Sequence, residues 1–312
     1  MGMFTLHVLG TSGSRPTATR SVSGNYLMTP HGGMIIDCGE GFQERLVRQD
    51  LSLKRSKAGK RAKASKVRVI LLTHCHLDHC WGLIPFLHTM NLDGRTEPLT
   101  VIAPGAPEGS DSQPDFNDLF GAWKEMIEEE YSRGRMGYEV EWVLIPIENQ
   151  SPIDSPVQPF EDLHLTAVPT RHGVISVAWL VSSKKRPQRR LMVSGDTSRG
   201  VTAFNSDIIG GELDVLIHEA TYSNETHDMA EVWGHSTAED AAKAATAMQA
   251  RLLGMLHLSS RISDPSVLEL EAAKHHNQSF VCEDGDIIEV SWSGDISVSR
   301  LQGDAWTDLS IG

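Results

Sequence analysis

The chain has 312 residues, of which 40% are hydrophobic and 22% charged, a composition that excludes wholesale disorder and provides an ample core for one large domain or two small ones. No apolar run approaches the roughly 18–20 residues of a membrane helix, and the N-terminal MGMFTLHVLG lacks the features of a signal peptide and of a myristoylation site, so we predict no membrane attachment. The net charge of −13 disfavours a nucleic-acid partner for the surface as a whole.

The first half of the chain alternates predicted strands with predicted helices. A strand at 4–10 precedes a hairpin of 25–30 and 34–38, a short amphipathic helix at 41–49 and a continuous apolar strand at 67–73. A helix at 83–91, a strand at 99–104, a longer helix within 115–133 and a strand at 138–147 follow, and a proline-rich loop covers 146–160.

The second half repeats the alternation. Strands are predicted at 163–169, 174–182, 189–195 and 213–219, followed by a helix at 237–250 capped by Ser236 or Thr237, a strand at 251–258, a helix at 264–276, a strand at 279–282 and a terminal pair of strands. This pattern predicts an α/β protein whose sheets are covered by helices. We predict one domain, 1–312, with halves 1–160 and 161–312, because the chemistry described below draws on both halves.

Two strongly basic segments interrupt the acidic chain. Segment 54–66 has seven basic residues and segment 184–190 has five, and neither contains an acid. Such patches can hold a polyanion locally, although both segments can equally be solvated loops, the second one a hairpin tip.

The cysteine content predicts the compartment. The four cysteines, Cys38, Cys75, Cys80 and Cys282, show no CxxC spacing and are too few for a disulfide framework in a chain of this length. We therefore predict a reducing, cytoplasmic setting.

The strongest local signal is the sequence THCHLDH at 73–79, directly after an apolar strand. Alternate residues of an extended segment face the same way, so His74 and His76 can converge on one ion, while Asp78 and His79 can face a second ion where the chain turns into a helix. Imidazole and carboxylate suit zinc, and also manganese or iron. The alternative is a chance histidine cluster at a strand end.

Four further polar residues end or follow predicted strands: His172, Asp196, Glu219 and His257. A lone residue of this kind is more often structural, but a set that recurs at strand ends indicates a site built at the carboxyl edge of a sheet. Weaker candidates for binding phosphate are the turn at 10–14 and the segment 259–261, SSR. GxSxG and P-loop motifs are absent from the sequence.

The sequence resembles the metallo-β-lactamase superfamily and, within it, the ribonuclease Z family of tRNA 3′-processing endonucleases. The resemblance extends over most of the chain, including LGTSGSRPTATRSVSGNYL, MIIDCGEGFQERLVR, LLTHCHLDHCWGLIPFLH, SGDTS, HEAT, GHSTAEDAA and LHLSSRI. The HxHxDH element marks only the superfamily, whereas HEAT, HST and HxSSR are more specific to the ribonuclease Z branch.

The resemblance implies a four-layered αββα fold and two zinc ions per chain. One ion would be held by His74, His76 and His172, and the other by Asp78, His79 and His257, with Asp196 bridging them. The resemblance also assigns proton transfer to Glu219 and His235, and implies a homodimer. His218 remains outside the ligand set.

The chemistry of these residue types fits that assignment. Two divalent ions about 3.5–4 Å apart stabilise charge on the attacking and leaving oxygens of a phosphodiester. Asp78 can also orient the nucleophile, and a carboxylate beside His235 favours the protonated imidazole that a departing ribose 3′-oxygen needs. Without the resemblance, His235 is equally a residue at the start of the following helix.

The chain departs from the family in one respect. Many ribonuclease Z proteins carry a long tRNA-gripping arm between the positions that match His172 and Asp196, but here the two are only 24 positions apart. One hypothesis is that segments 54–66 and 184–190 replace the arm.

The predicted function is a zinc-dependent endoribonuclease that removes the 3′ trailer of precursor tRNA. The first alternative is a small-molecule phosphodiesterase or arylsulfatase-like hydrolase with the same site, which the missing arm leaves open. A catalytically silent RNA-binding scaffold is another, and a thioester or lactam hydrolase is disfavoured by the HEAT and HST motifs.

Overall fold

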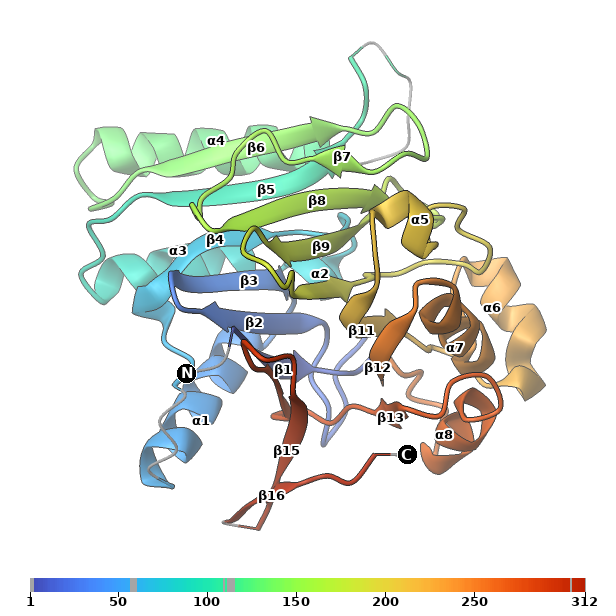
Figure 1. Cartoon of the computed structure of the whole chain (residues 1–312). Coiled ribbons are helices and arrows are strands. Elements are labelled where there is room, and N and C mark those ends of the chain that lie inside the picture. The colour runs from blue at the N-terminus through green and yellow to red at the C-terminus, as the bar shows by residue number, and fades with distance from the viewer. Residues whose placement is uncertain (1–2, 57–60, 109, 111–115, 304, 312) are drawn as a thin grey trace.

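The computed structural model describes residues 3–56, 61–108, 110, 116–303 and 305–311. Two β-sheets pack face to face, and helices cover the outer face of each sheet (Figure 1). The four-layered αββα arrangement predicted from the sequence is confirmed.

The first sheet has nine strands in the order β16-β15-β14-β1-β2-β3-β4-β5-β6. Its strands are β1 (Phe4–Gly10), β2 (Gly24–Thr29), β3 (Gly32–Cys38), β4 (Val67–Leu71), β5 (Leu99–Gly105), β6 (Val140–Pro146), β14 (Ile287–Val290), β15 (Ile296–Gln302) and β16 (Ala305–Asp308). Strands β3 to β6 are parallel, whereas β1 pairs antiparallel with both β2 and β14. The predicted terminal pair of strands is therefore a group of three that returns to the first sheet.

The second sheet has seven strands in the order β13-β12-β11-β10-β9-β8-β7. They are β7 (Ile153–Asp154), β8 (Leu163–Pro169), β9 (Val177–Ser183), β10 (Arg190–Val193), β11 (Leu213–Glu219), β12 (Ala250–Leu256) and β13 (Ser279–Val281). Strands β10 to β13 are parallel, and β8 runs in the same direction as β10 because both are antiparallel to β9.

The helices are α1 (Phe42–Arg55), α2 (Leu77–Cys80), α3 (Leu83–Leu92), α4 (Phe116–Ser132), α5 (Ser206–Ile209), α6 (His227–Trp233), α7 (Ala238–Ala247) and α8 (Ser266–Ala272). The predicted cap of α7 is present: Thr237 and Asp240 form a reciprocal capping box. Helix α1 extends beyond its predicted end because Leu53 continues the buried face of Leu46. Helix α6 escaped prediction because it is short and exposes Val232 and Trp233, which hides any amphipathic pattern.

The core lies in three layers. Between the sheets, Trp179, Leu191 and Val215 of the second sheet share one buried cluster with Met34 and Val69 of the first. Two outer clusters lie under the helices, one beneath α1, α3 and α4 and one beneath α7 and α8. Each such fully buried aliphatic side chain contributes about 1.5–3 kcal/mol. This packing fixes the strand ends from which the site is built.

Within the described residues, no helix is both long and apolar enough to cross a bilayer.

Candidate metal centre

The segment after β4 carries the histidine cluster. His74 and His76 lie in the extended stretch between β4 and α2, and His74 Nε2 is 3.1 Å from His76 Nδ1. Cys75, between them, packs against the outer apolar cluster instead. Asp78 and His79 follow within the single turn of α2, which directs them to a second position beside the first.

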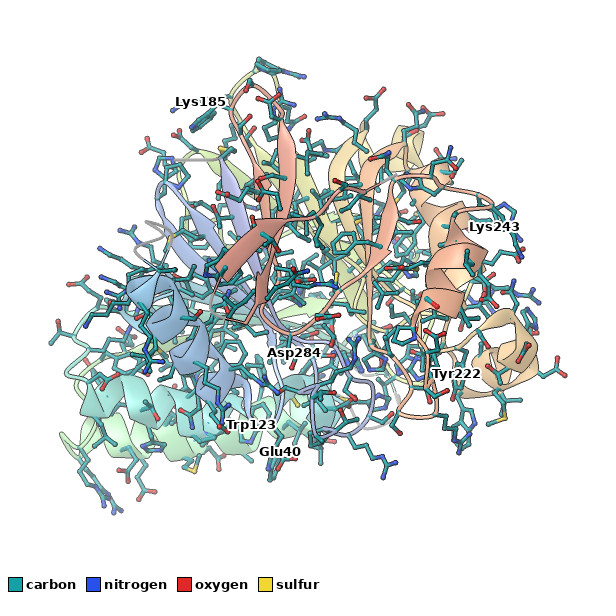
Figure 2. The ribbon with its side chains drawn as sticks, turned by 90° about the horizontal axis from the view of Figure 1, so that it is seen from below. Glu40, Trp123, Lys185, Tyr222, Lys243 and Asp284 are labelled. Atoms are coloured by element: carbon teal, nitrogen blue, oxygen red, sulfur yellow. The ribbon has the colours of Figure 1, made fainter. Side chains whose placement is uncertain are left out.

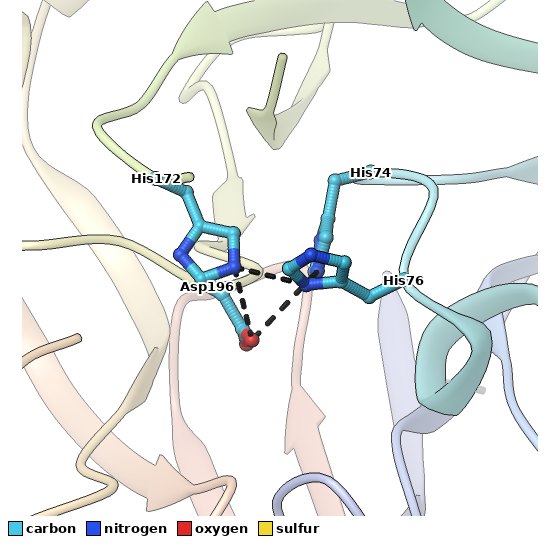
Figure 3. Close-up of side chains that lie close together, drawn as sticks. All are labelled: His74, His76, His172 and Asp196. Carbon is cyan, nitrogen blue, oxygen red and sulfur yellow. Dashed lines mark hydrogen bonds and ion pairs between the residues drawn. The ribbon is translucent and has the colours of Figure 1, made fainter. Parts of the chain in front are cut away.

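Strands of the second sheet complete the first group of candidate ligands (Figure 3). His172, just after β8, places Nε2 3.0 Å from His76 Nδ1. Asp196, after β10, places Oδ2 3.7 Å from His74 Nε2 and 3.8 Å from His172 Nε2. One atom from each of the four residues therefore faces a common point.

Asp78, His79 and His257 form the second group. His257, after β12, lies with Nε2 3.3 Å from Asp78 Oδ2, and His79 Nε2 is 3.7 Å from the same oxygen. The other oxygen of Asp196, Oδ1, is 3.2 Å from His79 Nε2 and 3.3 Å from His257 Nε2. Asp196 thus offers one oxygen to each group, in the bridging position that the sequence resemblance implied.

The hydrogen bonds around the two groups leave ring nitrogens with lone pairs facing inward. Nδ1 of His172 donates to the Gly234 carbonyl at 2.8 Å, and Nδ1 of His79 donates to Asp37 at 2.8 Å. The hydroxyl of Thr73 donates to Asp37, so it accepts from Nδ1 of His74. In the neutral form of each ring, Nε2 is therefore the nitrogen that carries the lone pair.

The same logic applies to His257. The Thr221 hydroxyl donates to Glu219 at 2.6 Å and therefore accepts from Nδ1 of His257 at 2.9 Å. Outer contacts of this kind, which fix the tautomer of a ligating histidine, accompany most protein metal sites.

The residues fit divalent metal ions. Among the described residues, Asp196 Oδ1 is buried without a hydrogen-bond partner, which is costly for a carboxylate oxygen unless a cation compensates it. Nε2 of His74 and Nε2 of His172 lie 3.1 and 3.0 Å from His76 Nδ1, so one cation can contact all three nitrogens. Bonds of about 2.0–2.1 Å in a tetrahedron place neighbouring ligand atoms roughly 3.3–3.4 Å apart, close to the observed separations.

The electrostatics favour the ligating forms of most of these groups. Burial, together with the neighbouring imidazoles, lowers the pKa values of His74, His76 and His172 and keeps these rings neutral. Burial opposes ionisation of Asp196, but His257 and His79 hold the pKa of its carboxyl well below the usual range. His79 differs: burial would lower its pKa, but Asp196 and Asp37 raise it. Of these two carboxylates, Asp196 would share a cation with His79, whereas Asp37 binds the outer nitrogen of the ring.

Glu219 and His235 lie beside the two groups. His235 Nδ1 is 2.9 Å from Glu219 Oε1 and 3.8 Å from Asp196 Oδ2. Burial lowers the pKa of His235, but the Glu219 carboxylate outweighs it and raises the pKa to about 9. Within the described part of the chain, no residue hydrogen-bonds the other ring nitrogen, Nε2, and 11% of the side chain is exposed. The pair can therefore hold a proton at the edge of the metal centre.

Two supporting residues were missed in the sequence. Asp37 ends β3 in a left-handed conformation (φ 60°) and binds His79 as well as the backbone and hydroxyl of Thr73. Thr221 links Glu219 to His257. Asp37 lies at the carboxyl end of an apolar strand, so the strand-end signal was available for it. Thr221 is the last residue of the HEAT motif, but the motif alone does not show which task its hydroxyl has.

The two weaker candidate segments lie at the rim of this centre. The backbone N–H of Ser14 donates to Asp78 Oδ2 at 2.8 Å, so the turn at 10–14 supports a candidate ligand with at least one of its amides. Ser260 accepts from the exposed Arg15 at 3.1 Å, and Arg261 is exposed next to Tyr222. The rim therefore presents arginines from separate loops.

The two basic segments lie elsewhere. Segment 184–190 joins β9 to β10 at their ends away from the metal centre, and in Figure 2 Lys185 lies at the opposite edge from Tyr222. Arg190 is buried and Arg189 pairs with Asp214, so both serve the fold. The described residues of segment 54–66 precede β4 on the same far edge, while 57–60 lie outside the described residues. That these segments replace the arm as the tRNA grip stays a prediction, and the structure places their described residues away from the metal centre.

Comparison with known families places this site in context. Residues 34–258 match the family model of the beta-lactamase superfamily domain, so the chain belongs to that superfamily. Within it, the chain is a member of the ribonuclease Z family. It is 31% identical to a ribonuclease Z of Natronomonas pharaonis, over 90% of this chain and 96% of the relative, and 28% identical to one of Gemmatimonas aurantiaca, over 93% and 96%.

Solved structures share the fold. The short form of human tRNase Z superposes with a TM-score of 0.68 at 24% identity and covers 91% of this chain and 98% of its own. The metallo-beta-lactamase fold protein YhfI of Bacillus subtilis gives a TM-score of 0.66 at 17% identity, covering 91% and 98%. At these identities the likeness concerns the fold.

Proposed function

We propose that the protein is a metal-dependent endoribonuclease that cleaves precursor tRNA at its 3′ end and removes the trailer. The observation that carries the proposal is the convergence of His172, Asp196 and His257 on the loop at 73–79, in a chain of the ribonuclease Z family. A ligand set assembled from distant strand ends supports hydrolysis rather than a purely binding role.

We propose zinc as the metal, with two ions per chain. His74, His76 and His172 would hold one ion, Asp78, His79 and His257 the other, and Asp196 would bridge them. Five imidazoles and two carboxylates form a donor set that suits zinc. When bound, such a pair supplies an activated water and neutralises charge on a phosphodiester.

The side chains of the protein have separate tasks. Asp78 accepts the Ser14 amide through Oδ2, which fixes the carboxylate so that it can also orient the attacking water. Glu219 holds the Nδ1 proton of His235, and His235 delivers a proton to the leaving ribose 3′-oxygen. General-acid help of this kind contributes about 10²–10⁴ in rate.

The rim supplies the contacts to RNA phosphates. Arg15, Arg171 and Arg261 are exposed on three different loops around the centre, and each is close in sequence or space to a candidate ligand. In a chain with a net charge of −13, this local cluster attracts a polyanion to the site and away from the rest of the surface.

We further propose that residues 1–312 act as one domain, that two chains form a homodimer, and that the protein works in the cytoplasm. The halves 1–160 and 161–312 both contribute ligands. A groove of about 580 Å³ between α1 and α3 exposes Val47 (57%) and Leu51 (45%), and a second copy would cover these side chains. All four cysteines are free, as in a reducing compartment.

The test is incubation of the purified chain with a 3′-extended tRNA, with and without a chelator. We expect a single cut that leaves a 3′-hydroxyl on the tRNA, abolished by chelation and restored by zinc. Parallel rates on cyclic nucleotides and aryl sulfate esters address the alternative. Faster turnover of those compounds, with the RNA left intact, would contradict the proposal.

A further inference from the structure

A second pocket lies directly beside the metal centre. It encloses about 610 Å³ and is walled by the loop at 198–204 and by α7. A small cavity of about 70 Å³, which includes His235, shares Arg171, Ser198 and Asp240 with it and joins it to the metal side. The volume lies within the range of about 300–1,000 Å³ that small-molecule sites occupy.

His218 supplies an unused acceptor to this pocket. Only 2% of the residue is exposed, and its Nδ1 donates to the Glu219 carbonyl at 2.7 Å. Burial lowers the pKa of His218, which keeps the ring neutral, so its Nε2 is an acceptor. Within the described residues, nothing hydrogen-bonds that nitrogen, and the residue lines the pocket. An acceptor that lines the pocket in this way can bind a donor of a ligand.

The pocket combines an apolar floor with cations at its mouth. Val201 and Phe204 are buried beneath it, and the ring of Phe204 meets that of His218 edge-on at 5.7 Å. Of the cations at the mouth, Arg199 pairs with Glu231 and Lys243 pairs with Glu239, whereas the guanidinium of Arg171 has no ion pair to a described residue. A flat heterocycle with a hydrogen-bond donor and an attached anion matches these three features.

We propose that this pocket is a nucleotide subsite, which receives the nucleotide on the 5′ side of the scissile phosphate. His218 Nε2 accepts a hydrogen bond from the base, Phe204 and Val201 contact the base, and Arg171 pairs with the 5′-phosphate of that nucleotide. This inference rests on the proposed function, because His235, which joins the pocket to the metal centre, is the group assigned to the leaving 3′-oxygen of the same nucleotide.

The test measures direct binding of nucleoside 5′-monophosphates to the zinc-loaded full chain by equilibrium dialysis, with ribose 5-phosphate and inorganic phosphate as reference ligands. We expect the nucleotides to bind at least about tenfold more tightly than either reference, because only they fill the apolar floor and reach His218. Arg171→Gln should weaken nucleotide binding about tenfold or more, since it removes a charge-assisted contact.

Arg68→Gln is the matched control. Arg68 is an exposed arginine before the metal loop but on the far edge of the sheet, and it has no ion pair to a described residue. His218→Gln tests the acceptor independently and should weaken the nucleotides more than ribose 5-phosphate. Circular dichroism spectra and zinc content show whether each variant is folded and loaded.

Two results would overturn the subsite: nucleotides that bind no more tightly than ribose 5-phosphate, or an Arg171→Gln effect no larger than that of Arg68→Gln. If precursor tRNA is not cleaved but nucleotides still bind in an Arg171-dependent way, the subsite stands and the substrate is a different nucleotide phosphodiester. Failure of the proposed function and failure of the subsite are therefore distinguishable.

Discussion

Glu219 Oε1 lies 2.9 Å from His235 Nδ1, and the same carboxylate is held from two other directions. Oε1 also accepts the Thr197 amide at 2.9 Å, and Oε2 accepts the Thr221 hydroxyl at 2.6 Å. A carboxylate anchored in this way cannot follow a moving partner, so it fixes the position of the imidazole. The pair is therefore a rigid proton-holding unit beside the metal centre.

His235→Ala should keep both zinc ions and lose about 10²–10⁴ in cleavage rate, because it removes the proton donor but no predicted ligand. Single-turnover cleavage of a 3′-extended tRNA, together with metal analysis, measures both quantities. His164→Ala, which removes a half-exposed histidine paired with Asp154, is the control. His235 also lies within ligand distance of Asp196 and His257, so loss of one ion in His235→Ala would make it a ligand instead.

Asp196→Asn should release both ions, whereas His172→Ala should release mainly one. Asp196 faces both groups, one oxygen to each, and its replacement removes the shared negative charge. We expect zinc content to fall from about two per chain to well below one in Asp196→Asn, since a ligand and its charge are lost together. Mass spectrometry of the dialysed proteins gives the ratio. Equal losses in the two variants would argue against a bridging role.

Asp37→Asn tests a residue that touches no metal. Its carboxylate accepts Nδ1–H of His79 and the amide and hydroxyl of Thr73. Loss of such an outer partner typically costs 10–100-fold in metal affinity, so we expect a drop of about that size. Competition with a chromophoric chelator measures it. An unchanged zinc affinity would show that His79 is oriented by packing alone.

Removing a positive charge at the rim of the metal centre should affect tRNA binding, whereas removing one at the far edge of the sandwich should not. Arg15→Gln and Arg261→Gln should each weaken tRNA binding. Each should also reduce by about 1 the slope of the logarithm of the binding constant against the logarithm of the salt concentration, as expected for a lost phosphate contact. The double variant of Lys184 and Arg186 to Gln should leave both quantities unchanged, because these exposed residues lie at the opposite edge. Filter binding between 50 and 200 mM salt separates the two cases. A larger effect of the far-edge variant would reinstate that segment as an RNA grip.

Two buried tyrosines should make the folded chain less stable at alkaline pH. Burial raises the pKa values of Tyr26 and Tyr138, and their hydroxyls donate to Lys63 and Leu87. Folding thus favours the neutral phenol. The resulting stability is complete below the unfolded pKa near 10 and is lost as the pH rises through the folded pKa, by about 1.4 kcal/mol per tyrosine at pH 11.

Tyr138→Phe isolates one of these groups. It should lower the free energy of unfolding by about 1 kcal/mol at pH 9, because one hydrogen bond is lost. Between pH 9 and pH 11, the free energy of unfolding should fall less in this variant than in the native chain. Urea unfolding at the two pH values measures both effects. Identical declines in the two proteins would show that Tyr138 does not contribute to the alkaline transition.

The sequence predicted the elements that carry strong periodicity or a long apolar run. The strand at 4–10, the two αβ layers and the cap of α7 are where the pattern placed them. Three short elements were not predicted. Helices α5 and α6 are too short to show a helical period, and β7 is a two-residue strand inside the proline-rich loop.

The candidate ligands were accessible because each follows an apolar strand, and the carboxyl ends of strands gather at one edge of a sheet. Their support was harder to foresee. Thr221 acts through a single hydroxyl between Glu219 and His257, and its place in the HEAT motif does not reveal these two contacts. The position of the basic segments was also hidden, because charge along a chain says nothing about which edge of the sandwich a loop occupies.

The origin of the ligands has a consequence for biosynthesis. The candidate ligands at 74–79 emerge with the loop after β4, but His257 follows nearly 180 residues later, and β14, which pairs with β1, comes later still. At about 5–20 residues per second, the early histidines lack His257 for about 9 to 36 seconds of synthesis. In the proposed two-ion site, the second ion is therefore bound late in the maturation of the chain, and we expect an incomplete translation product to carry exposed histidines without activity.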